Sequence, residues 1–339
     1  MAAFNASSTA SLMAEEPSSP PLLLPSRASL RWQILRRALL SRTSHAPAPS
    51  QLGGDSSRFN TKNISRKVAG GFKLIPCVPL NGHLKENQCD QRDAFVCYQL
   101  PVEGNPKLTL VHRTEDSIDF RDFDISTRYD IDTTGLICSW PSEEVLAYFC
   151  MNHGGIFRSK RVLELGSGFG LAGMVVAATT DACEVVISDG NPEVVNYIKR
   201  NIYLNSGIYG DTEVQPLALH WNQEHASNML NSFDIIIASD CTFFKDFHES
   251  LANTIKLLLK NSEDSEAIFF SPRRGNSLDR FLEKIKETGL EFLLVENYDD
   301  KVSSLHQKFL NGVDTSWPNY EKDHCYPIMI KIGFNRLLV

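Results

Sequence analysis

Residues 162–170, with the sequence VLELGSGFG, constrain the fold more than any other part of the chain. They read as a buried strand with an acid near its end, followed by a glycine turn, and the small apolar residues at 171–178 favour a helix. This order of strand, turn and helix builds a nucleotide-sized pocket at the carboxyl end of a parallel strand. The run therefore predicts an α/β sheet with a ligand at one edge.

Glu164 narrows the choice of ligand. A dinucleotide fold brings a pyrophosphate to the helix N-terminus, and an anionic side chain two residues before Gly166 would repel it. S-adenosylmethionine has no phosphate, and its ammonium and sulfonium are cations that Glu164 can help to bind. The spacing also departs from the dinucleotide pattern GxGxxG, because the third glycine is Gly170. These residues favour a methyl-donor site, with Gly166, Ser167 and Gly168 in contact with the cofactor.

Strand and helix patterns alternate from here towards the C-terminus. Besides the first strand, apolar runs predict strands over 184–189, 214–219, 233–240, 267–271, 292–295 and 328–332. Helices are expected over 171–178, from the N-cap Asn191 to Gly207, from Phe247 to 258 or 259, and over 277–288 before Gly289. The alternation predicts a doubly wound α/β fold, with a mostly parallel seven-stranded sheet and helices on both faces.

Composition divides the chain into an expected arm (1–60), a β-rich extension (61–135) and a main domain (136–339). The arm is rich in Ser, Ala and Pro, which favours disorder, and it contains one helix-compatible segment over 29–42. That segment is basic and amphipathic, so it either lies solvated on the domain or docks into an apolar groove. In the extension, apolar runs at 95–100 and 108–112 flank a Pro/Gly turn, which predicts an antiparallel pair.

Charge is distributed unevenly. Residues 1–73 hold ten Lys/Arg against three Asp/Glu, a net charge of +7, which leaves −14 for the rest of a chain whose total is −7. A basic arm on an acidic body favours an acidic protein partner. Nucleic acid would suit the arm but not the body, so we expect no nucleic-acid partner.

Metal, membrane and targeting signals are weak. The eight cysteines form no C-x-x-C pair and no Cys/His cluster, so no metal site is expected. No apolar run approaches the roughly 20 residues of a membrane span. Glu15 and Glu16 argue against an organelle transit peptide, which is poor in acids. We expect a reduced, monomeric protein of the cytoplasm, extending to the nucleus, with no membrane contact.

Asp189 and Asp240 end two of the predicted strands, so three acids, Glu164 included, converge on one sheet edge. Asp189 lies about 20 residues beyond the glycine turn, where an acid accepts hydrogen bonds from ribose hydroxyls. An NAD enzyme would use the same residue, so Asp189 indicates a nucleoside and not a methyl donor; a plain turn role is the alternative. Trp140 and Trp221 lie near strand ends, where each either covers the cofactor or belongs to the core.

Several stretches resemble the seven-strand methyltransferases that modify protein lysines: 134–141 (TGLICSWP), 162–170 and 188–191 (SDGN). Further stretches are similar to the branch of that family that acts on calmodulin: 238–241 (ASDC), 271–276 (SPRRGN) and 296–299 (ENYD), with His306 after them. The resemblance covers about 130–332. It implies a class I, Rossmann-like methyltransferase fold, S-adenosylmethionine as cofactor, and calmodulin as the protein whose lysine is methylated, up to the trimethyl form.

The resemblance also implies roles for single residues. Catalytic roles fall on Asp240, on Phe243, which stands where the family usually has Tyr, and on Tyr298. His306 is a further candidate, and no general base is assigned. Besides the glycine turn, Glu164 and Asp189, cofactor contacts fall on Trp140, Asn191, Trp221 and Ser239.

Methyl transfer to lysine requires the neutral amine. With a pKa of about 10.4, a free lysine reaches that form at pH 7 at a cost of roughly 4.6 kcal/mol. A dry aromatic channel beside the sulfonium lowers that pKa, and Phe243 and Phe244 either line such a channel or open a helix as core residues. Asp240 would orient the amine. Arg273 and Arg274 either attract the acidic partner or pair with nearby acids.

Other functions stay open from the sequence. One is methylation of another protein or of a small molecule, and another is a non-catalytic calmodulin-binding module that uses 29–42. Deleting residues 1–60 separates these classes, because a pure binder would lose its function and an enzyme would keep a cofactor-binding domain. Glu164 and the glycine spacing disfavour a nicotinamide dehydrogenase.

Overall fold

The computed structural model describes residues 70–80, 93–113, 120–129, 131, 133–137 and 140–334. The predicted arm over 1–60, including its helix at 29–42, lies outside the described residues. Among the described helices, none combines the length and the apolar character that a membrane crossing requires. Within the same residues, no group of three or more His, Cys, Asp or Glu side chains could hold a metal ion.

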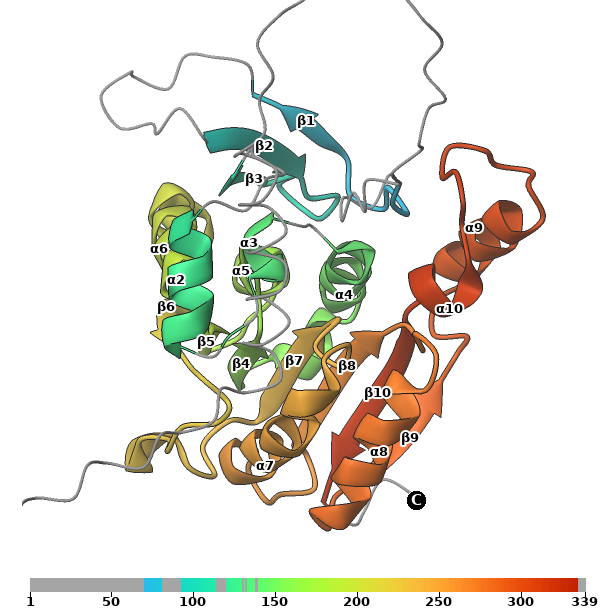
Figure 1. The fold of residues 1–339 in the computed structure, drawn as a ribbon. Coiled ribbons are helices and arrows are strands. Elements are labelled where there is room, and N and C mark those ends of the chain that lie inside the picture. The colour runs from blue at the N-terminus through green and yellow to red at the C-terminus, as the bar shows by residue number, and fades with distance from the viewer. Residues whose placement is uncertain are drawn as a thin grey trace, which may run out of the picture.

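The main sheet has seven strands in the order β6-β5-β4-β7-β8-β10-β9 (Figure 1). Strands β6, β5, β4, β7 and β8 pair in parallel, whereas β10 is antiparallel to both β8 and β9. The predicted fold, a mostly parallel seven-stranded α/β sheet, is confirmed. The strands are β4 (Arg161–Leu165), β5 (Glu184–Asp189), β6 (Glu213–Ala218), β7 (Ile235–Ser239), β8 (Glu266–Ser271), β9 (Glu291–Val295) and β10 (Ile328–Gly333).

Helices cover both faces of this sheet. In Figure 1, α4 (Pro141–Asn152), α5 (Leu171–Thr179) and α6 (Pro192–Leu204) lie above it, and α7 (His248–Leu258) and α8 (Ser277–Glu287) lie below. Two hydrophobic cores follow from the alternation of side chains along each strand. On β4, Val162 packs in the core that contains α5, whereas Leu163 and Leu165 pack in the core that contains α7 and α8. Glu164 therefore points to the α5 face.

The ends of two helices show what the sequence could and could not predict. Asn191 caps α6 as predicted, since its side chain accepts a hydrogen bond from the Glu193 N–H at 3.0 Å. That helix ends at Leu204 and not at Gly207, because the chain tightens into the 3-10 turn η2 (Ser206–Ile208) first. Gly289 does end α8, with a φ of +83° that favours glycine.

A three-stranded antiparallel sheet precedes the main sheet: β1 (Cys77–Pro79), β2 (Asp93–Gln99) and β3 (Lys107–Arg113). The predicted pairing of β2 with β3 is confirmed, with Val96 opposite Leu110. Two asparagines, Asn201 in α6 and Asn205 directly after its last residue, dock it on the main domain. Asn201 exchanges hydrogen bonds with the Val111 backbone at 2.8 and 3.1 Å, and Asn205 does the same with Thr109 at 2.8 and 2.7 Å.

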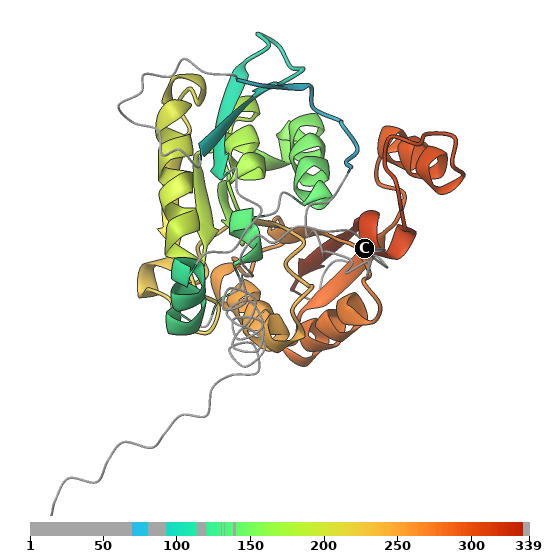
Figure 2. The ribbon, with the colours of Figure 1, turned by 45° about the horizontal axis from the view of Figure 1, so that its top comes forward.

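The sequence patterns did not predict several short elements. Helices α2 (Phe120–Tyr129) and α3 (Thr134–Ile137) lie in the region expected to be β-rich, and α9 (Asp300–Leu310) and α10 (Lys322–Cys325) lie late in the chain. In Figures 1 and 2, α9 stands at one side of the molecule. It is anchored by Phe309, whose ring meets Phe72 at 6.0 Å and Trp317 at 5.5 Å. The remaining 3-10 turns are η1 (Gly154–Phe157), η3 (Ser227–Met229) and η4 (Lys245–Phe247).

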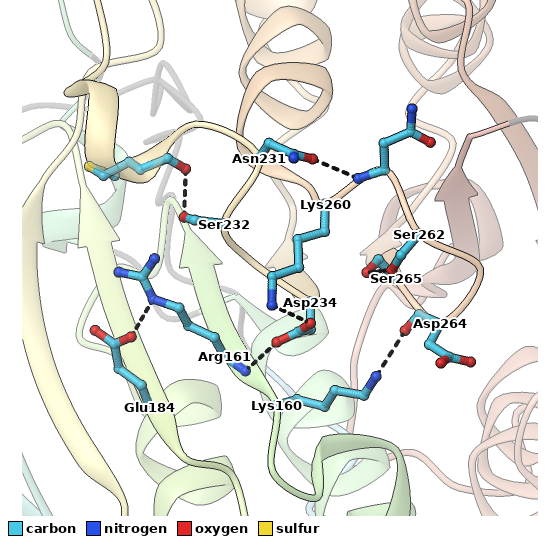
Figure 3. Close-up of polar contacts among 12 residues, drawn as sticks. Lys160, Arg161, Glu184, Asn231, Ser232, Asp234, Lys260, Ser262, Asp264 and Ser265 are labelled. Atoms are coloured by element: carbon cyan, nitrogen blue, oxygen red, sulfur yellow. Dashed lines mark hydrogen bonds and ion pairs between the residues drawn. The ribbon is translucent and has the colours of Figure 1, made fainter.

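The amino ends of the parallel strands carry a network of paired polar groups (Figure 3). Asp234 accepts hydrogen bonds from the Arg161 N–H at 2.8 Å and from the Lys260 ammonium at 2.7 Å. The Arg161 guanidinium also pairs with Glu184. At this edge, acids and bases thus satisfy one another, which fixes β4, β5 and β7 and leaves the ligand site to the opposite edge.

Candidate active site

A pocket of about 910 Å³, including its open mouth, lies at the carboxyl ends of β4, β5 and β7. Glu164, Phe243 and Tyr298 do not line it. The other predicted site residues do: Trp140, Gly166, Ser167, Gly168, Asp189, Asn191, Trp221, Ser239 and Asp240.

The glycine turn forms one wall of the pocket because it has almost no side chains. Gly166 and Gly168 have φ values of +57° and +56°, a region that glycine enters freely. A Cβ at Gly166 would lie 2.7 Å from the Cys241 Sγ and 3.2 Å from the Trp221 ring. Any larger residue would therefore both strain the backbone and fill the pocket.

Asp189 stands at the end of β5, where the parallel-sheet pattern placed it. Its Oδ2 accepts a hydrogen bond from the Gly168 N–H at 3.2 Å, and its Oδ1 accepts one from the Asn191 N–H at 2.8 Å. These bonds hold the carboxylate between the glycine turn and the start of α6. Asp189 lines the pocket at the place where an acid accepts hydrogen bonds from ribose hydroxyls in this type of sheet.

Glu164 lies behind the pocket wall, beneath α5. Its side chain is buried, and its Oε2 accepts a hydrogen bond from the Gly173 N–H at 2.8 Å. Its Oε1 is buried without a hydrogen-bond partner among the described residues. Burial, followed by the nearby Glu143, raises the pKa of this carboxyl well above its ordinary value. The Glu164 side chain lies on the α5 face of the sheet and does not line the pocket. Its predicted direct contact with a cofactor stays a prediction.

Glu143 is the acid in the pocket wall that sequence reasoning missed. It lies one turn after Trp140 on α4, and its Oε1 accepts a hydrogen bond from the Leu171 N–H at 3.1 Å. Burial raises the pKa of this carboxyl to about 7, and Glu144 adds to the rise. In the sequence it reads as an ordinary first-turn helix acid. Its partner, however, is the first turn of another helix, α5, and no local pattern signals that contact.

Two carboxyls therefore meet the same helix turn. Glu143 binds the first N–H of α5 at Leu171, and Glu164 binds the third at Gly173. Glu164 is buried and Glu143 lies partly buried near it, and their repulsion disfavours charging both. An anionic ligand would worsen this conflict, and a cationic ligand would relieve it. The electrostatics of the pocket thus disfavour a pyrophosphate and favour a ligand with a positive group.

Asp240 lies at the mouth of the same pocket, directly after β7, with an unusual φ of +55°. Its Oδ1 pairs with the Arg274 guanidinium at 2.8 Å. Its Oδ2 is buried and forms no well-aligned hydrogen bond among the described residues, although the Ser142 hydroxyl lies close to this carboxylate. Burial raises the pKa of Asp240, and Arg274 opposes the rise. Arg274 is 10% exposed, so it is no surface charge for attracting a partner. Arg273 pairs with Asp279 at 3.3 Å, as the alternative interpretation held.

The aromatic residues divide into pocket and mouth. Trp140, Trp221 and Phe244 line the pocket. Phe243 does not, and it is 44% exposed, which excludes the interpretation that it is a core residue. Its ring meets Phe244 edge-on at 4.8 Å, so it lies beside the pocket residue.

Tyr298 and His306 belong to a different cluster. The Tyr298 hydroxyl donates to the Pro327 carbonyl at 2.9 Å, and its ring stacks near Tyr326. The His306 Nδ1 meets the Tyr320 hydroxyl at 2.7 Å. Neither side chain lines the pocket, so this geometry gives no support to the catalytic role suggested for Tyr298.

Comparison with known proteins decides the family. The sequence pattern of a family described as lysine methyltransferase matches residues 129–288. A calmodulin-lysine N-methyltransferase of Arabidopsis thaliana is 55% identical over 307 residues, covering 91% of this chain and 97% of that protein. The chain belongs to the lysine methyltransferase family.

Other relatives of this lysine methyltransferase are more distant. The protein-lysine N-methyltransferase EFM3 of Chaetomium thermophilum is 27% identical over 253 residues, covering 72% of this chain and 67% of that protein. A solved SAM-dependent methyltransferase of Aquifex aeolicus is 15% identical, with a TM-score of 0.37, covering 64% of this chain and 98% of that chain. As a family member, the protein is a protein-lysine N-methyltransferase that uses S-adenosylmethionine.

The pocket residues fit this cofactor. The raised pKa of Glu143, in the pocket wall, and the unpartnered Oε1 of Glu164, buried behind that wall, favour a positive group in the pocket, which the amino-acid end of the cofactor carries. Asp189 is a carboxylate in the pocket lining, the kind of group that accepts hydrogen bonds from ribose hydroxyls, and the glycine turn leaves the room that a Cβ would fill. The tryptophans Trp140 and Trp221 offer ring surface to its apolar parts.

Proposed function

We propose that this enzyme methylates a lysine of calmodulin. The observation that carries the proposal is the 55% identity to a calmodulin-lysine N-methyltransferase over almost the whole of both chains. Identity to EFM3, a protein-lysine N-methyltransferase, is 27%. In a relative that methylates another substrate, we expect the residues at the pocket mouth, where the acceptor enters, to differ from those of this chain.

Each part of the pocket has a proposed task. Gly166, Ser167 and Gly168 form the close wall, Asp189 accepts hydrogen bonds from the ribose hydroxyls, and Glu143 balances the charge of the amino-acid ammonium, backed by Glu164. When bound, S-adenosylmethionine supplies a methyl group activated by its cationic sulfur. Further contacts are proposed for Trp140, Asn191, Trp221 and Ser239, all of which line the pocket.

At the acceptor end, the protein must present a neutral lysine amine. Phe244 in the wall and Phe243 beside it provide an apolar entrance that strips water from the side chain. Asp240 orients the amine through its carboxylate. The amine nitrogen then forms a bond to the methyl carbon while the carbon–sulfur bond breaks, and the electron pair of that bond stays on sulfur.

The test is transfer of a labelled methyl group from S-adenosylmethionine to purified calmodulin, with other purified lysine-rich proteins as parallel acceptors. We expect label on calmodulin alone, and mass spectrometry should show up to three methyl groups on one lysine. Asp189→Ala should lower transfer strongly at limiting S-adenosylmethionine, whereas Asp181→Ala, at an exposed residue paired with Arg158 at 3.2 Å, should not. Calmodulin that binds without gaining label would contradict the proposal, as would label on another acceptor.

Three expectations stay predictions. They are the monomeric state, the location in cytoplasm and nucleus, and the division of the chain into arm, extension and methyltransferase domain at 60 and 135. Sedimentation of the full chain and imaging of a tagged protein would test the first two.

A further inference from the structure

The Asp240–Arg274 pair is the one ion pair of the described residues that touches both the acceptor end of the pocket and its aromatic rings. The guanidinium lies 4.6 Å from the centre of the Trp140 ring and 5.2 Å from that of Phe243. These distances are in the range of cation–π contacts. The side chains of the pair are 10% and 5% exposed, so water screens their charges weakly.

Arg274 is held in this place by its backbone. It lies in the turn between β8 and α8, with a left-handed φ of +45°, and Gly275 after it has a φ of +68°. Its N–H donates to the Asp323 carbonyl at 2.7 Å, which ties the turn to α10. A non-glycine residue in this conformation is uncommon and persists where surrounding contacts enforce it. The cation is therefore a fixed part of the pocket mouth.

A carboxylate at the acceptor end creates a difficulty for lysine chemistry. A lone Asp240 would attract the lysine ammonium and stabilise it, because an opposite charge within about 4–6 Å favours the charged form of a group. The ammonium has no lone pair and cannot accept a methyl group. An acid that binds the acceptor well would thus hold it in the unreactive form.

We propose that Arg274 is a positioning residue that neutralises Asp240, so that the acceptor lysine binds next to this carboxylate and still loses its proton. The guanidinium takes Oδ1, and the rest of the carboxylate, beside the Ser142 hydroxyl, accepts a hydrogen bond from the amine. The lysine proton passes to water before transfer, and no side chain has to keep it. This inference rests on the proposed lysine-methylating function.

The experiment compares the pH dependence of kcat for calmodulin methylation in four proteins: the parent, Arg274→Gln, Arg274→Lys, and Arg274→Gln combined with Asp240→Asn. The rising limb of kcat reports the pKa of the bound acceptor. In Arg274→Gln, the uncompensated carboxylate should move that limb upward by about one pH unit, which is an about tenfold loss of kcat near neutral pH that is recovered at alkaline pH. KM for calmodulin should stay level or fall.

The other two variants test the cause. Arg274→Lys keeps the charge and should keep the limb of the parent. The double variant removes both charges, so its limb should return to within about half a pH unit of the parent, even with a lower plateau. The remaining titratable groups near the pair are unchanged in all four proteins: Glu143, Glu164, Asp189, Cys241, Glu321 and Cys325.

Arg273→Gln is the matched control, since it removes the neighbouring arginine, which pairs with Asp279 and Glu296 outside the pocket. Its limb should match the parent. Calorimetry with S-adenosylhomocysteine shows that each variant is folded and binds cofactor, and if Arg274→Gln fails this check, Arg274→Met, which keeps an unbranched side chain on Trp140, takes its place.

Two failures are distinguishable. If the parent does not methylate calmodulin, the proposed function is wrong. If the parent is active and the limb of the folded Arg274→Gln or Arg274→Met variant stays in place, the role of Arg274 is wrong. A limb that moves equally in Arg274→Lys or in the double variant would also overturn it, because the shift would then not follow the charge.

Discussion

At the scale of single residues, the site is organised by carboxyls that are held in costly positions. Glu143 and Glu164 both cap the first turn of α5, and neither forms an ion pair with a cationic side chain in the described part of the chain. The α5 dipole and N–H groups offset part of this cost. A positive group in the pocket offsets the remaining electrostatic cost of the two carboxyls, and this adds to the binding free energy of a cationic ligand.

Replacing Glu143 by Gln should therefore weaken cofactor binding in a pH-dependent way. With a pKa of about 7, Glu143 gains its charge as the pH rises through neutrality, and only the charged form attracts an ammonium. We expect S-adenosylhomocysteine to bind the variant about tenfold more weakly near pH 8 and with little change near pH 6. Calorimetry in two buffers of different ionisation heat measures both the affinity and the protons released.

The same variant should be more stable without ligand above neutral pH. The folded pKa of about 7 lies above the unfolded value, so the folded state binds more protons in between, and stability falls as the pH rises through about 7. Glutamine avoids this loss, which gives a gain of about 1–3 kcal/mol near pH 8 in urea unfolding. Glu193→Gln, at an exposed first-turn acid of α6, is the control. If the affinity of the parent for S-adenosylhomocysteine did not change between about pH 6 and pH 8, the assignment of a raised pKa to Glu143 would be wrong.

Sequence reasoning located the residues whose role is local. Gly166 and Asp189 are readable because a glycine turn after a strand, and an acid after the next strand, have fixed places in a parallel sheet. Glu143 and Arg274 were not assigned to the pocket because each acts on a group far away in the chain. Glu143 meets α5 across 28 positions, and Arg274 meets Asp240 through a turn whose left-handed backbone no composition rule signals.

At the scale of elements, α6 and the residue that follows it join the two sheets through amide side chains as well as through the shared apolar core. Asn201 and Asn205 stand one turn apart and satisfy both the N–H and the carbonyl of Val111 and of Thr109. Their amide groups pair with the backbone of β3 in the way that a neighbouring strand would. Because each amide pairs two backbone groups that are otherwise buried, its loss leaves both unsatisfied.

Asn201→Ala should lower the free energy of unfolding by about 2–4 kcal/mol, because two buried backbone groups and a third bond to the Phe169 carbonyl lose their partner. Asn205→Ala should cost somewhat less, about 1–3 kcal/mol, since its surroundings are less buried. Asn253→Ala, on the exposed face of α7, should change stability by less than about 0.5 kcal/mol. Urea unfolding followed by circular dichroism measures the free energy of unfolding of all three variants. If Asn201→Ala and Asn205→Ala lost no more stability than Asn253→Ala, the docking role would be wrong.

The elements themselves were predicted in proportion to their periodicity. The strands of the main sheet and helices α5 to α8 have long apolar patterns, and their positions agree with the structure within a few residues. Strand β1 has three exposed residues and pairs only with β2, so no pattern marks it. Helix α9 was missed because its buried positions, Val302, His306 and Phe309, include a histidine that reads as polar.

At the scale of the whole molecule, the two edges of the main sheet have separate tasks. The amino edge pairs its acids with bases, as Asp234 does with Lys260 and Glu184 does with Arg161. The carboxyl edge holds acids that cap backbone N–H groups and face the pocket, as Glu143 and Asp189 do. A parallel sheet permits this separation, because every βα turn of the ligand site opens at the same end.

Replacing one acid at each edge by alanine should affect different properties: the free energy of unfolding at the amino edge and the cofactor affinity at the carboxyl edge. Asp234→Ala removes the partner of the Arg161 N–H and of the Lys260 ammonium, so unfolding free energy should fall by about 2–4 kcal/mol, with S-adenosylhomocysteine affinity unchanged within about twofold. Asp189→Ala should weaken that ligand about 10–100-fold, because charged hydrogen bonds to hydroxyls contribute about 1.5–3 kcal/mol. Calorimetry and urea unfolding of both proteins form the test. An Asp234→Ala variant that loses cofactor affinity at full stability would show that the edges are coupled, and the separation argued from the sheet would then be wrong.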